Sequence, residues 1–419
     1  MFNNYICALD IGSSKIAGLV AQIKRNNISN IFFEVNSSAG VKKGAVGDSV
    51  ELVEHLSSLL KSLKLKSGIN IKSVYANISG EDIITKHSFA NIPLTERGNK
   101  VITRQDLENV TEQARILGSS LQEEIIHAIA YGYTIDSREN LLNPLGLYSH
   151  RLAVDLYLIC VKLSSLQSLT HAINEAGLEL KGLFLSGLAT SEAVFNETSN
   201  NGTNILVDIG SDTTEALFFK DGLLQDLQIL SVGGRDLTQG LSDALSINFN
   251  LAEEIKRSHG DICVDAIAPE GKEILIKKGD AYIPVKQELV FKTLKAAAWY
   301  ICLAIKEAMH KKKINPLSIN NFVVTGRTVL LEGFIEDLEE ALGIPVKLAR
   351  PTNNNLPLSL IGENSNLSGQ KYLTYLTSLG ILCQALKEKP VGAALVKRQI
   401  KNPIAKAINR VKEVYQEYF

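Results

Sequence analysis

Apolar and polar positions along the chain follow both the spacing of helices and the alternation of strands, and one pattern occurs twice. Residues 8–13 (ALDIGS) recur as residues 206–211 (LVDIGS), and a second apolar run follows each copy. Apolar runs on both sides of a short polar turn predict a β-hairpin, here once in each half of the chain. The matching flanks favour a duplicated unit over two unrelated turns. Apolar residues at helical spacing predict helices over residues 103–118, 294–309 and 372–385, and Thr103 is the candidate N-cap of the first.

The composition of the two turns predicts a site for phosphate. Glycine lets the backbone approach a ligand closely, and successive N–H groups with hydroxyl side chains form an anion-binding nest. A further glycine pair precedes an amphipathic helix, where it suits a phosphate-facing turn or only a hinge. The candidate phosphate-binding residues are Gly12, Ser13, Ser14, Lys15, Gly210, Ser211, Thr213, Thr214, Gly233 and Gly234.

An aspartate precedes each turn. A carboxylate in direct contact with phosphate is repelled, but it can hold Mg²⁺ through water, which Mg²⁺ prefers. Asp10 and Asp208 are therefore the candidate metal-binding residues. The seven histidines form no cluster with ligand spacing, so no transition-metal site is expected.

Composition narrows the functional classes. The 419 residues suffice for two or three domains, and 45% apolar with 21% charged residues is typical of a globular protein. The net charge of −1 argues against a general nucleic-acid binder. The five cysteines lack close pairing, which indicates a reducing compartment. We expect neither a signal peptide nor a membrane-spanning helix, so any membrane contact would be peripheral.

The last residues predict an amphipathic helix over residues 403–419. Pro403 suits its first turn, and residues 397–419 contain six basic and two acidic side chains. Such a helix either packs on its own domain or lies on an anionic membrane, and its basic character after a linker favours the membrane. The candidate membrane-binding residues are Ile404, Ile408, Val411, Tyr415, Tyr418 and Phe419, bordered by Arg410 and Lys412.

Several motifs make the chain resemble the superfamily of actin, heat-shock chaperones and sugar kinases, and within it the FtsA family of bacterial cell-division proteins. Beside the two hairpins, the resemblance rests on residues 74–80 (VYANISG), 130–136, 143–147 (NPLGL) and 186–194. It implies an α/β fold of duplicated actin-like (ribonuclease H-like) domains with an inserted 1C-type subdomain.

The resemblance also implies the boundaries of the subdomains. These are 1–83 and 163–200 for subdomain 1A, 84–162 for inserted subdomain 1C, 201–235 and 316–370 for 2A, 236–315 for 2B, 371–388 for a closing helix of 1A, 389–402 for a linker and 403–419 for the membrane-binding helix.

By the same resemblance, the helix at 251–257 and the strand ending at 326 would contact adenosine. The residues that the resemblance assigns to adenosine binding are Glu253, Lys256, Arg257, Gly326 and Arg327. Arg327 replaces the second glycine of the family's adenosine motif. Glu192 is a candidate for activating water.

The second hairpin departs from the family as well. Ser211, Asp212 and Glu215 stand where the family has further glycines and an aspartate. An extra carboxylate at Asp212 would repel a triphosphate unless Mg²⁺ or water intervenes. We therefore expect ATP and Mg²⁺ as cofactors, with hydrolysis weak or absent.

The implied function is a polymerising, ATP-binding adaptor that tethers the FtsZ ring through the FtsZ C-terminal tail. Its other expected partners are copies of itself, an anionic membrane surface and further divisome proteins, at the division septum on the cytoplasmic face of the inner membrane. No nucleic-acid partner is expected. The alternatives are a small-molecule kinase or phosphatase of the superfamily, and a PilM-like scaffold with a degenerate nucleotide site.

Overall fold

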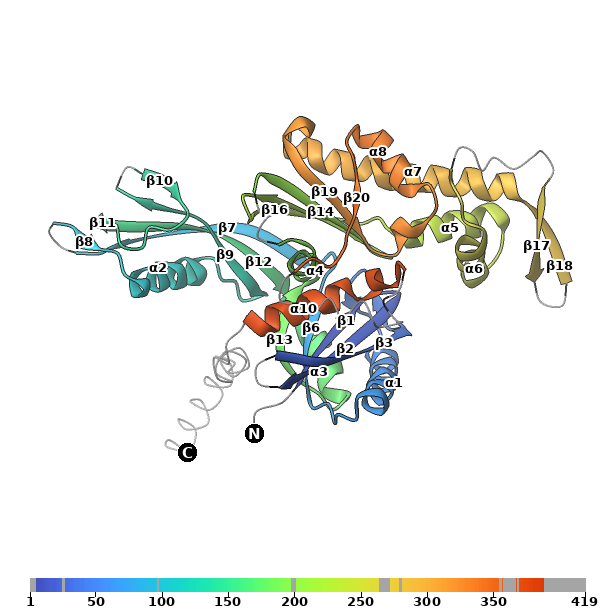
Figure 1. Cartoon of the computed structure of the whole chain (residues 1–419), viewed down its shortest axis with the longest axis horizontal. Helices are drawn as coiled ribbons and strands as arrows, with labels where there is room; N and C mark the ends of the chain where they lie inside the picture. The colour runs from blue at the N-terminus through green and yellow to red at the C-terminus, as the bar shows by residue number, and fades with distance from the viewer. Residues whose placement is uncertain are drawn as a thin grey trace, which may run out of the picture.

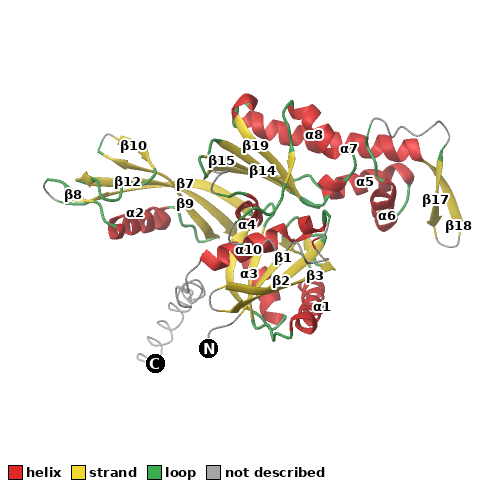
Figure 2. Ribbon diagram, in the orientation of Figure 1, coloured by secondary structure: helices red, strands yellow, loops and turns green. Residues whose placement is uncertain are grey.

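The computed structural model contains two five-stranded sheets of matching topology, to which two further units are attached (Figure 1). Runs of strands are separated by helices along the chain, and the strands gather into separate sheets (Figure 2). The structure describes residues 5–24, 27–95, 98–136, 138–196, 201–263, 272–278, 281–353, 356, 367 and 369–387.

The first sheet has the strand order β13-β6-β1-β2-β3. Strand β1 is antiparallel to β2 and parallel to β6, which is parallel to β13. Alternate residues of β1 face opposite sides, so Cys7, Leu9 and Ile11 pack towards α1 while Ala8 faces the rest of the core. Its elements are β1 (Tyr5–Ile11), β2 (Lys15–Lys24), β3 (Asn27–Ser37), α1 (Ser49–Ser67), β6 (Ser73–Ile78), α3 (Leu163–Glu175), β13 (Glu179–Leu185) and α4 (Ser186–Val194).

The second sheet repeats this arrangement with the order β16-β15-β14-β19-β20. Strand β14 is antiparallel to β15 and parallel to β19, as β1 is to β2 and β6. The duplication expected from the sequence repeat is thus present in the fold. Its elements are β14 (Thr203–Ile209), β15 (Thr214–Lys220), β16 (Leu223–Leu230), β19 (Ile319–Thr325), α8 (Phe334–Leu342) and β20 (Lys347–Leu348), with short 3-10 turns at Pro316–Ser318 and Thr328–Leu330.

A separate sheet with the order β10-β9-β12-β7 is inserted between β6 and α3, and it extends to the left in Figure 1. Helix α2 covers one face with its own apolar core. The predicted N-cap is confirmed, because Thr103 and Asp106 form a capping box at the start of α2. Its elements are β7 (Ile83–Pro93), β8 (Lys100–Val101), α2 (Arg104–Leu117), β9 (Glu123–Ile135), β10 (Arg138–Leu141), β11 (Tyr148–Ser149) and β12 (Arg151–Lys162).

The second attached unit lies between β16 and β19, at the right of Figure 1. Its long helix α7 buries a continuous apolar stripe that includes Leu294, Ile301 and Ile305, which confirms the helix predicted over 294–309. Its elements are α5 (Gly234–Leu245), α6 (Phe249–His259), β17 (Glu273–Lys278), β18 (Ala281–Lys286) and α7 (Gln287–Lys311).

The chain returns to the first sheet through a 3-10 turn (Lys371–Tyr375) and helix α10 (Leu376–Lys387). The helix predicted from residue 372 therefore begins as a 3-10 turn. Helix α10 crosses α4 so closely that a Cβ on Gly380 would lie 1.7 Å from the Ala189 carbonyl oxygen. The apolar core around α10 and α4 is continuous with that of the second sheet, because α4 also packs against β14 and β15.

We expect Gly380→Ala to destabilise the protein by about 1–3 kcal/mol or more, because the added methyl group forces α10 away from α4. Gly240→Ala is the matched control. It also lies inside a helix, but its nearest neighbour would be the Thr293 Cγ2 at an ordinary 3.5 Å. This control should gain about 0.5–1 kcal/mol from higher helix propensity. Thermal and urea unfolding measure both, and equal stability of the two variants contradicts the close crossing.

Candidate functional site

The two predicted hairpins are equivalent position by position. Asp10 pairs with Ala17 across the first hairpin, and Asp208 pairs with Glu215 across the second. Each turn closes in the same way, from Gly12 N–H to the Lys15 carbonyl and from Gly210 N–H to the Thr213 carbonyl, both at 3.0 Å. Residues 10–17 therefore correspond to residues 208–215.

The two turns face each other across a cleft of about 720 Å³. This volume lies within the range of small-molecule sites. Most predicted site residues line it, namely Asp10, Gly12, Ser13, Ser14, Lys15, Asp208, Gly210, Ser211, Thr213, Gly234, Glu253, Lys256, Arg257, Gly326 and Arg327.

Two predicted phosphate-binding residues do not line the cleft. Thr214 lies within β15, where side chains alternate between faces, and its hydroxyl donates to the Val232 carbonyl at 2.8 Å inside the core. Gly233 lies behind the second turn, and its N–H donates to the Asp236 carboxylate at 2.7 Å. Both residues therefore support the second turn from outside the cleft.

The N–H groups at the start of α5 are also engaged. Gly234 N–H donates to the Gly210 carbonyl at 2.9 Å, and Arg235 N–H donates to the Ser211 carbonyl at 2.7 Å. These donors fix α5 against the second turn, so this helix start does not offer them to a phosphate.

Glu192, the candidate for activating water, also lies outside the cleft. Its carboxylate forms an ion pair with Lys387 at the end of α10, and its carbonyl accepts from Asn353 Nδ2 at 2.6 Å. The helix α4 that carries it faces α10 at this point. The predicted linker and the membrane-binding helix lie outside the described residues, as does most of residues 354–370.

The floor of the cleft holds Asp10 in a fixed position. Lys15 Nζ lies 2.5 Å from one of its oxygens and also donates to the Thr374 carbonyl at 2.7 Å. Asn77 Nδ2 donates to the other oxygen at 2.8 Å, while Asn77 Oδ1 accepts from Ile11 N–H at 2.6 Å. Sequence reasoning did not single out Asn77, although it lies in the 74–80 motif.

Asp208 lies opposite, and among the described residues it has no such partners. Burial, and then the nearby Asp10 charge, raise its pKa to about 6. Two carboxylates at the floor of a polar cleft fit a hydrated Mg²⁺. Within the described ranges, no group of three or more His, Cys, Asp or Glu side chains could hold a metal ion by itself.

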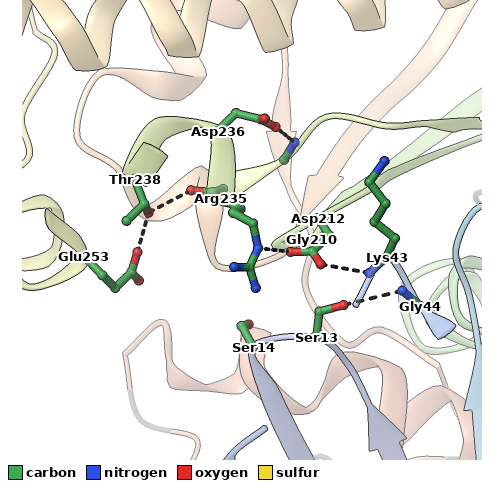
Figure 3. A network of polar contacts seen from close by, with 12 residues as sticks. Ser13, Ser14, Lys43, Gly44, Gly210, Asp212, Arg235, Asp236, Thr238 and Glu253 are labelled. Carbon is green, nitrogen blue, oxygen red and sulfur yellow. Dashed lines mark hydrogen bonds and ion pairs between the residues drawn. The ribbon is translucent and has the colours of Figure 1, made fainter. Parts of the chain in front are cut away.

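The sequence suggested that the negative charge of Asp212 would be uncompensated, but in the structure this charge has partners. One carboxylate oxygen accepts from Arg235 Nε at 2.7 Å, and the other accepts from the backbone N–H of Lys43 at 2.8 Å (Figure 3). Burial opposes ionisation of Asp212, but these two donors outweigh burial and lower its pKa. The carboxylate thus links the second turn to the first half of the protein.

The Lys43 segment is a tight turn between β4 (Val41–Lys42) and β5 (Ala45–Val46). Lys43 and Gly44 both have positive φ, 51° and 80°, which is the geometry of a type I′ turn. A Cβ on Gly44 would lie 2.2 Å from the Ser79 carbonyl oxygen, so glycine is required there. Gly44 N–H also lies 3.5 Å from Ser13 Oγ (Figure 3), so this turn contacts both hairpins. The Lys-Gly pair between apolar residues was its only sequence signal.

The candidate adenosine helix is held by an internal network. Glu253 accepts from Thr238 Oγ1 at 2.5 Å, and it pairs with Lys256 at 2.6 Å and with Arg257 at 2.8 Å. Lys256 Nζ also donates to the Gly234 carbonyl at 2.9 Å and to Thr238 Oγ1 at 2.7 Å. These contacts tie α6 to α5, so a ribose hydroxyl at Glu253 would share an occupied carboxylate.

Glu215 is the cleft residue with the most unusual environment. It is 3% exposed, and one oxygen accepts from Gly187 N–H at 2.7 Å. The other oxygen is buried and has no hydrogen-bond partner in the described part of the chain. Burial, and then the charge of Asp208, raise the pKa of Glu215 to about 8. At neutral pH the side chain is therefore protonated.

Comparisons with known proteins agree with this fold. The family model "Cell division protein FtsA" matches residues 205–380, and "SHS2 domain inserted in FTSA" matches residues 80–160. The cell division protein FtsA of Pseudomonas aeruginosa is 23% identical over 93% of this chain and 91% of its own length. That of Escherichia coli K12 is 24% identical over 99% of this chain and 98% of its own length.

Among solved structures, a PilM-PilN type IV pilus biogenesis complex aligns with a TM-score of 0.62 at 14% identity, covering 92% of this chain and 99% of that chain. Identity this low shows the fold alone. The duplicated sheets around one cleft define an actin-like protein with an inserted SHS2 domain. The chain belongs to the FtsA family of cell-division proteins. No helix among the described residues is long and apolar enough to cross a membrane.

The raised pKa of Glu215 predicts a pH-dependent stability. The folded state holds the proton up to about pH 8, whereas the unfolded carboxyl releases it near 4.5. Between these values the folded state binds more protons, so stability falls as pH rises and is level again above pH 8. Glu215→Gln should remove this slope, a difference on the order of a few kcal/mol, while its amide oxygen still accepts from Gly187.

Thermal unfolding from about pH 5 to about pH 9 measures this difference. The matched control is Glu254→Gln, which neutralises an exposed carboxyl on α6 and should keep the wild-type slope. An unchanged slope in Glu215→Gln shows that Glu215 is ionised in the folded state.

Proposed function

We propose that this chain is an ATP-binding adaptor of the division machinery that forms filaments and tethers FtsZ to the cytoplasmic face of the membrane at the septum. The observation that supports nucleotide binding best is the pair of equivalent turns on opposite walls of one cleft. The turns offer hydroxyl side chains to phosphate from both walls. Asp10 and Asp208 would hold Mg²⁺ through water.

Slow or absent hydrolysis fits the state of the acidic side chains in the described cleft. Asp10, Asp212 and Glu253 are each paired with a lysine or arginine. Glu215 retains a proton at neutral pH. Asp208 is then the one cleft carboxylate, among the described residues, that is ionised at neutral pH and not engaged by a cation. Phosphoryl transfer depends on a positioned base or water-orienting group, so this cleft suits a nucleotide-dependent switch better than a fast kinase or phosphatase.

The membrane role rests on the sequence of residues 403–419 and on family membership. The apolar side chains of this segment would enter the lipid interface, and Arg410 and Lys412 at their border would meet anionic headgroups. One such helix binds weakly, so filaments that present many copies would bind the membrane firmly. The FtsZ C-terminal tail and other divisome proteins would be recruited to that assembly.

ATP titration of the purified chain, with Mg²⁺ and with EDTA, tests nucleotide binding. The wild type should bind ATP, and Mg²⁺ should strengthen binding. Asp208→Ala should remove most of the Mg²⁺-dependent gain, because one of the two floor carboxylates is lost. The control Asp243→Ala removes an exposed carboxyl on α5 that accepts from Gln239 Nε2 at 2.8 Å, and it should behave as wild type. Absence of binding by the wild type ends the ATP proposal.

Liposome sedimentation tests the membrane role. Removing residues 403–419 should abolish sedimentation with vesicles that contain anionic lipid, while neutral vesicles should retain little of either protein. A variant with Ile408→Glu and Val411→Glu interrupts the apolar face without shortening the chain, and it should also lose sedimentation. Sedimentation that survives both changes rules out this segment as the anchor.

A further inference from the structure

Arg327 is attached to the second turn through both of its neighbours. Gly326 has φ 95° and packs so closely on the end of β14 that a Cβ there would lie 2.1 Å from the Ile209 carbonyl oxygen. On the other side, Thr328 Oγ1 donates to the Gly210 carbonyl at 3.1 Å. The backbone of residue 327 is therefore fixed beside the second hairpin.

The side chain of Arg327 nevertheless reaches the first hairpin. Its Nη2 donates to Ser14 Oγ at 3.0 Å, and both residues line the cleft. The guanidinium thus bridges the space between the two turns, where phosphate groups of a ligand would lie. A planar guanidinium also matches phosphate geometry better than any other cation in proteins.

Arg327 differs from the other cations of the cleft in its lack of an acidic partner. Lys15 pairs with Asp10, Arg235 with Asp212, and Lys256 and Arg257 with Glu253. In the part of the chain that the structure describes, Arg327 makes one hydrogen bond and no ion pair. Burial, and then repulsion by Arg257, lower its pKa, although the charges of Glu253 and Asp10 act in the opposite direction. A partly buried guanidinium without an anion is unfavourable.

Comparison of the two equivalent turns shows that, among the described residues, the first turn has no anion for its arginine. Ser14 and Asp212 occupy equivalent positions in the two turns. At the second turn, the Asp212 carboxylate provides the anion for Arg235. At the first turn, Arg327 faces the neutral hydroxyl of Ser14. The second turn thus contains its own anion, and the first turn requires one from a ligand.

We propose that Arg327 binds the phosphates of a nucleoside polyphosphate against the Ser14 side of the cleft, in place of an adenosine contact. This role rests on the proposed nucleotide function and specifies it further. The guanidinium neutralises phosphate charge that Mg²⁺ otherwise neutralises alone, so the chain retains substantial ATP affinity when Mg²⁺ is removed. The backbone of Arg327 is fixed beside the second turn, and its side chain reaches Ser14 of the first turn. Phosphate bound to Arg327 on the Ser14 side therefore also holds the two halves of the cleft together.

Competition against a fluorescent ATP analogue tests this role, with ATP, ADP and AMP each measured in Mg²⁺ and in EDTA. Arg327→Gln should weaken ATP binding about 10- to 100-fold in EDTA, which is the usual loss for a hydrogen-bonded charge pair. The loss should be smaller in Mg²⁺, and it should decline from ATP to AMP as phosphates are removed. Arg327→Lys keeps the charge without the planar fork, so it should lose less than Arg327→Gln.

The matched control is Lys292→Gln, which removes one positive charge from an exposed ion pair on α7 away from the cleft and should leave all three affinities unchanged. Thermal unfolding confirms that each variant is folded, and Arg327→Lys carries the test if Arg327→Gln is not. Wild-type binding with unchanged ATP affinity in the arginine variants overturns this role alone. Equal losses for ATP and AMP also overturn it, since they indicate a contact to the base or ribose. A wild type that binds no ATP overturns the proposed function and this role together.

Discussion

The cleft depends on a turn that is formed twice in the same way. In each hairpin a glycine N–H donates to the carbonyl oxygen of the residue three positions further along the chain. The two residues between them are left at the surface of the cleft. The strand before each turn is parallel to the next strand of its sheet and packed on both faces, so the turn cannot move without its whole sheet. The relative position of the two sheets therefore determines the geometry of the site.

Contacts between the halves use the same turns. Asp212 of the second turn accepts from the Lys43 backbone in the first half, and Ser14 of the first turn accepts from Arg327 in the second half (Figure 3 shows the first of these). Polar contacts at a domain junction are exchanged with water at little cost in free energy. Apolar packing of α4 against β14 and β15 provides the fixed side of the junction, and the polar contacts form the side that the proposed nucleotide would change.

The sequence predicted those features that depend on local pattern. The hairpins, the Thr103 cap and the long helix around Leu294 each follow from residues close together in the chain. It could not place Glu192, since its distance from the cleft depends on how α4 meets Lys387 of α10. The contacts of the Lys43 turn and the protonation of Glu215 were not predicted for the same reason. Both depend on burial and on neighbouring charges that distant segments of the chain provide.

The departures from the family pattern have a common physical effect. Asp212 introduces a fixed negative charge with its own arginine, Glu215 remains neutral at the floor, and Arg327 adds a positive charge without an ion-pair partner among the described residues. Under the proposed function, each change would place in the protein charge compensation that Mg²⁺ and solvent would otherwise supply. Such a site would stabilise bound phosphate equally in the ground state and in the transition state, and equal stabilisation does not accelerate transfer. The proposed nucleotide site would therefore favour occupancy over turnover, which is the property that a structural switch requires.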